Sequence, residues 1–329
     1  MRKVECAALA ILAGILAIHG SARCEAPPLA VIAKIPLPDS KGRIDHLAFD
    51  PDRGRLFVAE LGNNSVAIVD VARQRFERRL TGLAEPQGMA FVAETDAVYV
   101  ATGGDGVLRA FQAADMSAIA SVDVGDDADN IRVDAKSGRV YVGVGDGGLA
   151  ALDPRTLARL GEIPLRGHPE GFQLSSRGAH IFVNVPDSRE VAVVDRSTGK
   201  QVTSWSTGEL RGNFPMAIDD ASGEVVSVFR SPPKIVAYRA TNGKVVHEAE
   251  ICADADDVFV DMRRNRLYVI CGAGVIDVLK GATLERIARI STVEGARTGL
   301  FAADDDLLFV AARAAADRDA AVWVLKPND

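Results

Sequence analysis

Two short acidic segments carry the side chains of this chain that are best suited to chemistry. Residues 125–130 read GDDADN, and residues 252–257 read CADADD. Carboxylate and amide oxygens are the ligands that calcium and magnesium prefer, and a histidine nearby adds transition-metal options. Carboxylates gathered in one narrow space also repel each other and lose hydration, which raises some of their pKa values unless a cation or an arginine compensates. The two segments predict one shared site if the fold brings them together.

Further residues of these types occur at comparable spacing along the chain. The predicted ligand-binding set consists of Asp45, His46, Asp129, Asn130, His168, Glu170, Asn213, Arg230, Asp256, Asp257 and Arg297. Within this set, His46, His168 and Glu170 are the candidates for a catalytic acid or base. Arg230 and Arg297 could hold a carboxylate or a phosphate through paired hydrogen bonds. The alternative for each residue is structural, because Asp and Asn before a strand commonly cap turns and a loop arginine can pair with the aspartates.

A repeat of about 42 residues underlies this spacing. Seven short apolar segments mark it: LAFD, MAFV, IRVD, FQLS, MAID, VFVD and LFAA, which end at residues 50, 92, 134, 175, 219, 261 and 303. A turn and a β-branched, aromatic segment follow each of them, as in VYVAT at residues 98–102, and two more strand patterns complete the unit. Four antiparallel strands at this spacing are typical of one propeller blade. The chain is therefore predicted to be all-β, with a single seven-bladed β-propeller domain over residues 27–329.

The ends of the chain predict how the ring closes. The last unit lacks a fourth strand, whereas residues 29–37 form a strand pattern with no unit of its own. Pairing the two would complete the last blade and remove the exposed sheet edges. In such a ring, the residues four and five positions before each repeat end converge on one mouth of the central channel. The acidic segments 125–130 and 252–257 would then face each other across it.

Two family resemblances follow from these residues. The segments LFVAELGNNSVAIVD (56–70) and VYVATGGDGVLRAF (98–111) resemble the repeat of YVTN β-propellers, which implies that fold and export from the cytoplasm. The channel ring resembles the site type of gluconolactonase and senescence-marker propellers, which hold a divalent cation on Glu, Asn and Asp of inter-blade loops. By this resemblance Glu170, Asn130 and Asp256 would be metal ligands, with Asp129 beside them. Calcium or magnesium would be the cation.

The N-terminus and the cysteines predict where the protein resides. Arg2 and Lys3 precede an apolar run at residues 7–18 and small residues before Pro27, a pattern typical of a secretory signal peptide over residues 1–26. The run is too short for a membrane span, so an exported protein in the periplasm or outside the cell is expected. Cys252 and Cys271 would remain in the mature chain as a disulfide or, alternatively, as two buried thiols.

Composition and missing motifs exclude several functions. The formal net charge is −7, so no basic footprint for nucleic acid is present. The sequence contains no CxxCH haem motif, P-loop, GxSxG elbow or HExxH zinc helix. Residues 195–205, DRSTGKQVTSW, resemble a quinoprotein dehydrogenase repeat, but the tryptophan lies too far from Gly-Lys and no other unit repeats the pattern. No quinone cofactor is therefore expected.

Two functional hypotheses remain. The first is an exported, monomeric propeller that binds a small molecule, peptide or protein partner at the channel face. The second is a metal-dependent hydrolase, lactonase or lyase that uses the carboxylate-rich ring. The first is favoured because the sequence contains no catalytic motif.

Overall fold

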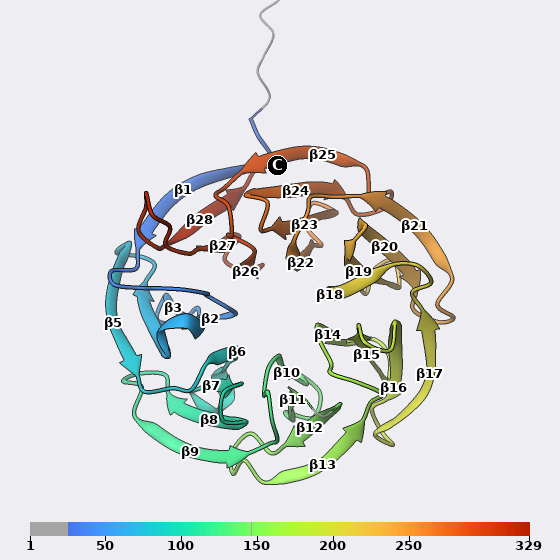
Figure 1. The fold of residues 1–329 in the computed structure, drawn as a ribbon, viewed down its shortest axis with the longest axis horizontal. Coiled ribbons are helices and arrows are strands. Elements are labelled where there is room, and N and C mark those ends of the chain that lie inside the picture. The colour runs from blue at the N-terminus through green and yellow to red at the C-terminus, as the bar shows by residue number, and fades with distance from the viewer. Residues whose placement is uncertain (1–25, 146) are drawn as a thin grey trace, which may run out of the picture.

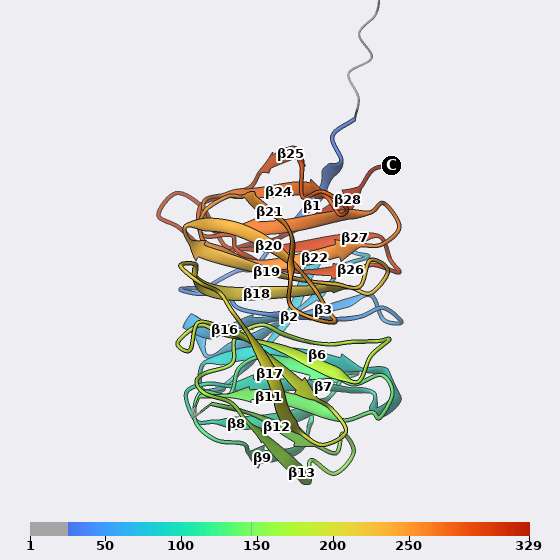
Figure 2. The same cartoon turned by 90° about the vertical axis from the view of Figure 1, so that its right-hand side faces the viewer.

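The computed structural model describes residues 26–145 and 147–329, which form seven four-stranded antiparallel sheets around a central channel (Figure 1; Figure 2). The predicted seven-bladed β-propeller is confirmed. The predicted signal peptide falls almost entirely outside the described residues. No helix in the described part of the chain is long and apolar enough to cross a membrane.

Each blade runs from an innermost strand at the channel to an outermost strand at the rim (Figure 1). The first three blades are β2 (Leu47–Asp50), β3 (Arg55–Glu60), β4 (Ser65–Asp70) and β5 (Arg75–Thr81); β6 (Pro86–Val92), β7 (Ala97–Thr102), β8 (Val107–Gln112) and β9 (Ala118–Asp123); and β10 (Ile131–Val133), β11 (Val140–Val144), β12 (Gly148–Leu152) and β13 (Arg159–Pro164). Two 3₁₀ turns, η1 (Leu61–Asn63) and η2 (Ala93–Thr95), lie between strands of the first two blades.

The remaining blades follow the same order. They are β14 (Phe172–Leu174), β15 (His180–Val185), β16 (Glu190–Asp195) and β17 (Lys200–Ser206); β18 (Arg211–Asp219), β19 (Glu224–Ser231), β20 (Pro233–Arg239) and β21 (Val245–Glu250); β22 (Ala255–Asp261), β23 (Arg266–Cys271), β24 (Val275–Lys280) and β25 (Arg286–Ser291); and β26 (Thr298–Ala302), β27 (Leu307–Ala312), β28 (Ala321–Pro327) and β1 (Leu29–Pro36). The last blade is completed by β1, which pairs antiparallel with β28, so the two ends of the chain close the ring as predicted.

The core lies between neighbouring blades, where their second and third strands are buried on both faces. In β7, for example, all six residues are buried, whereas the outermost strand β9 alternates exposed and half-buried residues. At one equivalent position, the second strands of six blades place an aromatic side chain in this core: Phe57, Tyr99, Tyr141, Phe182, Tyr268 and Phe309. In the fifth blade Val226 takes that position, and the buried aromatic residue of the strand is Phe229. Burial of large rings on both sides of each blade fixes the blades against one another.

Several acidic residues that end the innermost strands hold the following turns. The carboxylate of Asp50 accepts a hydrogen bond from the backbone N–H of Arg53, and that of Asp134 accepts one from Lys136. Asp261 accepts a hydrogen bond from Arg263 in the same way. These aspartates cap tight turns through their own side chains. The aspartate that ends the repeat segment is therefore structural in these three blades.

A disulfide joins Cys252, which precedes β22, to Cys271, which ends β23, with Cα atoms 5.9 Å apart. Both residues are buried in the core between the fifth and sixth blades. The bond closes a loop with a sequence separation of 19 residues.

Reduction of this disulfide, or its removal in a Cys252→Ala, Cys271→Ala double variant, is expected to lower the free energy of unfolding by about 3 kcal/mol, because the unfolded chain regains the entropy of that loop. Thermal denaturation with and without reductant measures the effect. The double variant serves as the control, since its melting temperature should not respond to reductant. An equal response of both proteins to reductant would contradict the expectation.

Candidate functional site

The loops that enter the innermost strands bring most of the predicted residues to one cavity of ≈ 40 Å³ in the central channel. Its acidic, amide and imidazole lining consists of Asp45, His46, Asp129, Asn130, Glu170, Asp256 and Asp257. These residues come from the first, third, fourth and sixth blades. The cavity has room for an ion or for a very few water molecules, since a single water needs about 10–15 Å³.

The backbone of each loop is tied to the second strand of its own blade. The N–H of Asp45 donates to the carbonyl of Ala59 at 2.8 Å, and the N–H of Asp129 donates to that of Gly143 at 3.0 Å. In the fourth blade, Glu170 donates to the carbonyl of Asn184 at 3.0 Å. Because the same bond recurs in three blades, the carboxylates project from equivalent, fixed positions around the channel.

Arginines neutralise some of the carboxylates that line the cavity. Arg43 lies 2.7 Å from the carboxylate of Asp45. On the opposite side, Asp256 pairs with Arg230, and the Nε of Arg297 lies 2.9 Å from its other oxygen. Arg230 is stacked over the ring of Phe214, with its guanidinium carbon 4.0 Å from the ring centroid. Both arginines of the predicted ligand-binding set are thus held by aspartates, which is the structural role foreseen as their alternative.

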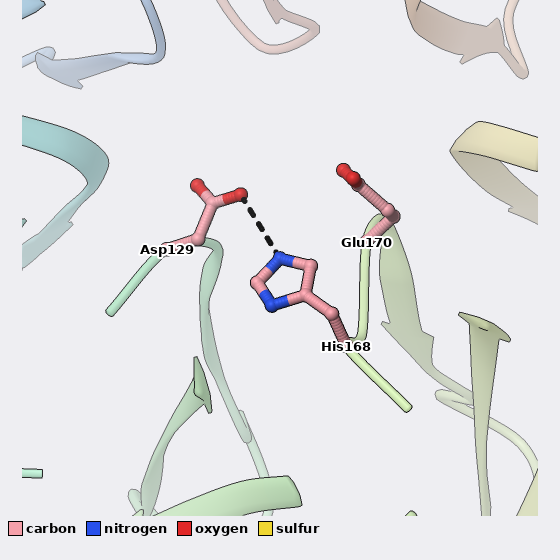
Figure 3. A group of neighbouring side chains, drawn as sticks. All are labelled: Asp129, His168 and Glu170. Carbon is pink, nitrogen blue, oxygen red and sulfur yellow. Dashed lines mark ion pairs between the residues drawn. The ribbon is translucent and has the colours of Figure 1, made fainter. Parts of the chain in front are cut away.

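Asp129, His168 and Glu170 form a second type of cluster that contains no arginine. Figure 3 shows their side chains turned toward one another from the loops that enter the third and fourth blades. One potential ligand atom of each lies within 4.8 Å of those of the other two. The Nε2 of His168 is 4.0 Å from Oδ2 of Asp129, too far for a hydrogen bond. Three protein ligands of these types around an open position are typical of a site for a divalent metal ion.

Unpartnered oxygens face the same region. Oδ1 of Asp129 and Oδ1 of Asn130 are buried and accept no hydrogen bond from the described residues. The amide of Asn130 donates only a long bond of 3.4 Å to Oδ2 of Asp129. A buried polar atom without a partner costs about 1–3 kcal/mol, so such atoms point to a missing ligand, ion or water.

Burial raises the pKa values of the carboxyl groups in this ring. The pKa of Glu170 rises from its ordinary value of 4.5 to about 8, chiefly through burial and then through the charge of Asp256. The pKa of Asp129 lies well above its ordinary range because of burial and the neighbouring Asp45 and Glu170. Burial likewise raises the pKa of Asp257, although its carboxylate accepts a 2.7 Å hydrogen bond from the N–H of Gly299. Simultaneous ionisation of all these carboxyl groups is therefore unfavourable without a bound cation.

His46 lines this cavity and is neutral near pH 7. Burial, followed by the positive charge of Arg132, lowers its pKa to about 4. Its closest charged partner is Asp45, whose carboxylate lies 3.9 Å from Nε2. A neutral imidazole in this position can accept a proton from a bound molecule.

The two acidic segments hold the rim of the site in similar ways. Asp127 and Asp254 both adopt positive φ angles, of 47° and 59°, which aspartate tolerates better than most residues. Asp127 accepts a hydrogen bond from the amide of Gln87 and lies 3.9 Å from Nδ1 of His168, whereas Asp254 is paired with Arg297. Strand β10 follows the first segment and strand β22 begins within the second, and the two strands lie across the channel from each other (Figure 1).

Asn213 has a different environment from the rest of the predicted set. Its side-chain amide is fully buried and donates to the backbone carbonyl of Glu190 at 3.0 Å, which ties the fifth blade to the fourth. It does not line the cavity. Conversely, Arg132 and Gln173 line the cavity but were missing from the predicted set. The sequence could have identified both residues, because they are the only polar ones among the first three positions of the seven otherwise apolar repeat segments.

Comparison with known proteins supports the propeller assignment. Residues 172–329, the last four blades and just under half of the chain, match the PQQ_2 family model, which is described as outer membrane protein assembly factor BamB. No curated protein matches the chain. Assignment to the YVTN type stays a prediction from the sequence. The partial family match and the ring of seven four-stranded sheets together identify the chain as a protein of the β-propeller repeat type.

Proposed function

We propose that this chain is an exported propeller of the YVTN type that binds a small molecule, peptide or protein at its channel face, through a divalent cation held by Asp129, His168 and Glu170. The observation that carries the proposal is the convergence of these three side chains, with ligand atoms within 4.8 Å of one another. No arginine of the described residues lies within 4.0 Å of either carboxylate, unlike those of Asp45 and Asp256. A divalent cation would neutralise the two carboxylates and give their oxygens a partner.

The charge distribution supports this cluster rather than its neighbours. Asp45, which is buried, and Asp256, which is partly buried, already have arginine partners. Asp129 has none among the described residues within 4.0 Å. The resemblance to gluconolactonase propellers suggested Asp256 as a metal ligand. Because two arginines already pair with Asp256, we place His168 in the ligand set instead. The carboxylate of Asp127, 3.9 Å from Nδ1 of His168, is near enough to orient the imidazole so that Nε2 faces the cluster.

The ligand types favour a transition ion such as zinc or manganese over calcium or magnesium. An imidazole nitrogen beside two carboxylates suits the former, whereas all-oxygen ligand sets suit the latter. Proton release is expected on binding, because both carboxyl groups must lose their protons to act as ligands.

Metal analysis of the purified protein tests the proposal. We expect near-stoichiometric zinc or manganese in the wild type and a rise in melting temperature when either ion is added to chelator-treated protein. Asp129→Asn and Glu170→Gln should each lose the ion and this response. Asp126→Asn is the matched control, because Asp126 lies in the same acidic segment but is exposed, and it should behave as wild type.

Three results would overturn the metal site. One is a melting temperature that no tested cation changes. Another is an unchanged cation response in Asp129→Asn. A response to calcium or magnesium alone, unaffected by His168→Ala, would place the ion on oxygen ligands without the imidazole.

Other observations support export and a macromolecular partner. The N-terminal pattern of a signal peptide and the disulfide between Cys252 and Cys271 both suit an oxidising compartment. The partial match to a model described as an outer membrane protein assembly factor favours a protein partner among the possible ligands. The loops at this end of the ring form the face that a partner would contact.

The alternative function is a metal-dependent hydrolase, lactonase or lyase. The observation that favours it is His46, an imidazole held neutral by burial in the wall of the same cavity. It would act as the general base beside a cation that polarises a carbonyl group. Turnover of a lactone or ester that requires both the cation and His46 would favour this alternative over a binding function.

A further inference from the structure

A second and larger cavity of ≈ 520 Å³ occupies the channel on the other side of His46 and Arg132. His46, Arg132, Gln173, Asp257 and Phe259 line both cavities and thus form the layer that separates them. The larger cavity, the funnel, opens beside Pro51, Asp304 and Asp305, which are exposed. Its volume falls within the usual range for pockets that bind small organic molecules.

The wall of the funnel is apolar and aromatic. Phe49, Phe91, Phe259 and Phe301 line it and also pack against the cores between the blades. The ring of Phe49 lies 5.2 Å from that of Phe309, and the ring of Phe301 lies 5.4 Å from that of Tyr268. These contacts hold the rings in place, so the wall is formed before any ligand arrives.

The inner end of the funnel carries a cationic group without a counter-ion. Within the described part of the chain, no carboxylate lies within 4.0 Å of the guanidinium of Arg132, whereas Arg43 has one such partner and Arg230 and Arg297 have two each. Arg132 donates one hydrogen bond, of 2.8 Å, to the carbonyl of Ile131, and its guanidinium carbon lies 5.6 Å from the ring centroid of Phe172. Its other N–H groups donate to no other described residue, so they can bind an anion.

The polar neighbours of Arg132 in the funnel do not pair with it. The carboxylate of Asp257 accepts its 2.7 Å hydrogen bond from the N–H of Gly299 rather than from Arg132. His46 is neutral near pH 7. The exposed Asp304 and Asp305 at the mouth oppose the entry of a second negative charge.

From this geometry we propose that the funnel binds an organic monoanion with an apolar body, whose carboxylate or sulfonate pairs with Arg132 while the body lies among the phenylalanine rings. This site is distinct from the proposed metal site and does not depend on it. A neutral molecule of the same shape would lack the ion pair. A dianion would place its second charge on the apolar wall or against the aspartates at the mouth.

Calorimetric titration with 2-naphthoate tests the proposal, using 2-naphthalenemethanol and 2,6-naphthalenedicarboxylate as the neutral and dianionic probes. We expect 2-naphthoate to bind more tightly than either probe. Arg132→Met keeps the length of the side chain without its charge and should weaken 2-naphthoate about 10- to 100-fold, with little effect on the alcohol. Arg132→Lys should recover part of the loss.

Ala90→Phe is the second variant, because it fills the funnel and leaves Arg132 in place. It should abolish binding of 2-naphthoate even if Arg132→Met proves unstable. Chelator should leave the affinity unchanged, so failure of the metal site and failure of the funnel are separable. Absence of 2-naphthoate binding to the wild type, or equal affinity in Arg132→Met or Ala90→Phe, would overturn the proposal.

Discussion

Ile35→Asp is expected to prevent the ring from closing and to abolish the cooperative unfolding transition of the whole propeller. Ile35 is completely buried and lies opposite Val322 in the pairing of β1 with β28. It belongs to a core cluster that also contains Leu56 and Val58 of the first blade. Loss of the side chain alone would cost about 2–5 kcal/mol, and the unpaired buried charge would add several more. The sum approaches the whole stability of a typical domain, about 5–15 kcal/mol.

The same strand supplies the control. Ile32 is half exposed, at 50%, and lies at the bulge between Val31 and Ala33, where the register of β1 shifts. Ile32→Asp introduces the same charge three residues away without burying it. We expect its melting temperature to stay within a few degrees of the wild type. Urea denaturation monitored by circular dichroism compares the two variants. A stable, cooperatively folded Ile35→Asp protein would show that β1 is dispensable for closure.

The fold could be predicted because each blade repeats the same pattern of strands, turns and buried residues. The interval of about 42 residues, the buried aromatic residue of each second strand and the missing fourth strand of the last unit were all visible in the sequence. In the fifth blade, Val226 stands where the others have an aromatic residue and packs in the core shared with the sixth blade. Trp205 and Tyr238, whose rings lie 5.6 Å apart, fill the core that the fifth blade shares with the fourth. One irregular unit therefore did not obscure the architecture.

The sequence predicted where the candidate site lies but not which of its arginines and aspartates form ion pairs. The repeat indicated which residues converge on the channel, because equivalent positions in a ring lie at the same height. It could not indicate that Arg230 and Arg297 bind Asp256 while no described arginine lies within 4.0 Å of Asp129. Those contacts depend on side-chain directions across blades. The funnel was missed for a related reason. Arg132 occupies a strand position that was read only as part of an apolar segment.

The pH dependence of stability gives the second large effect, and its sign follows from the raised pKa of Glu170. An acid with a raised pKa in the folded state stabilises the protein fully below its unfolded pKa of 4.5, and this contribution is lost as the pH rises toward about 8. His46 acts in the opposite direction between its folded pKa of about 4 and its ordinary value of 6.5. The two effects largely cancel below pH 6.5. Between pH 6.5 and 8, Glu170 alone should lower the free energy of unfolding of the metal-free protein by about 2 kcal/mol.

Urea denaturation of chelator-treated protein at pH 6.5 and pH 8 measures this loss, and Glu170→Gln should remove most of it. Asp129 and Asp257, whose pKa values are also raised, act in the same direction and can only steepen the decline in the wild type. Saturating zinc or manganese should reverse the trend, because deprotonation improves the ligands and binding at about 100 times Kd adds about 3 kcal/mol. A wild-type stability that is equal at both pH values would contradict the buried acid. A loss at pH 8 that Glu170→Gln abolishes and no cation restores would retain the buried acid but reject the metal.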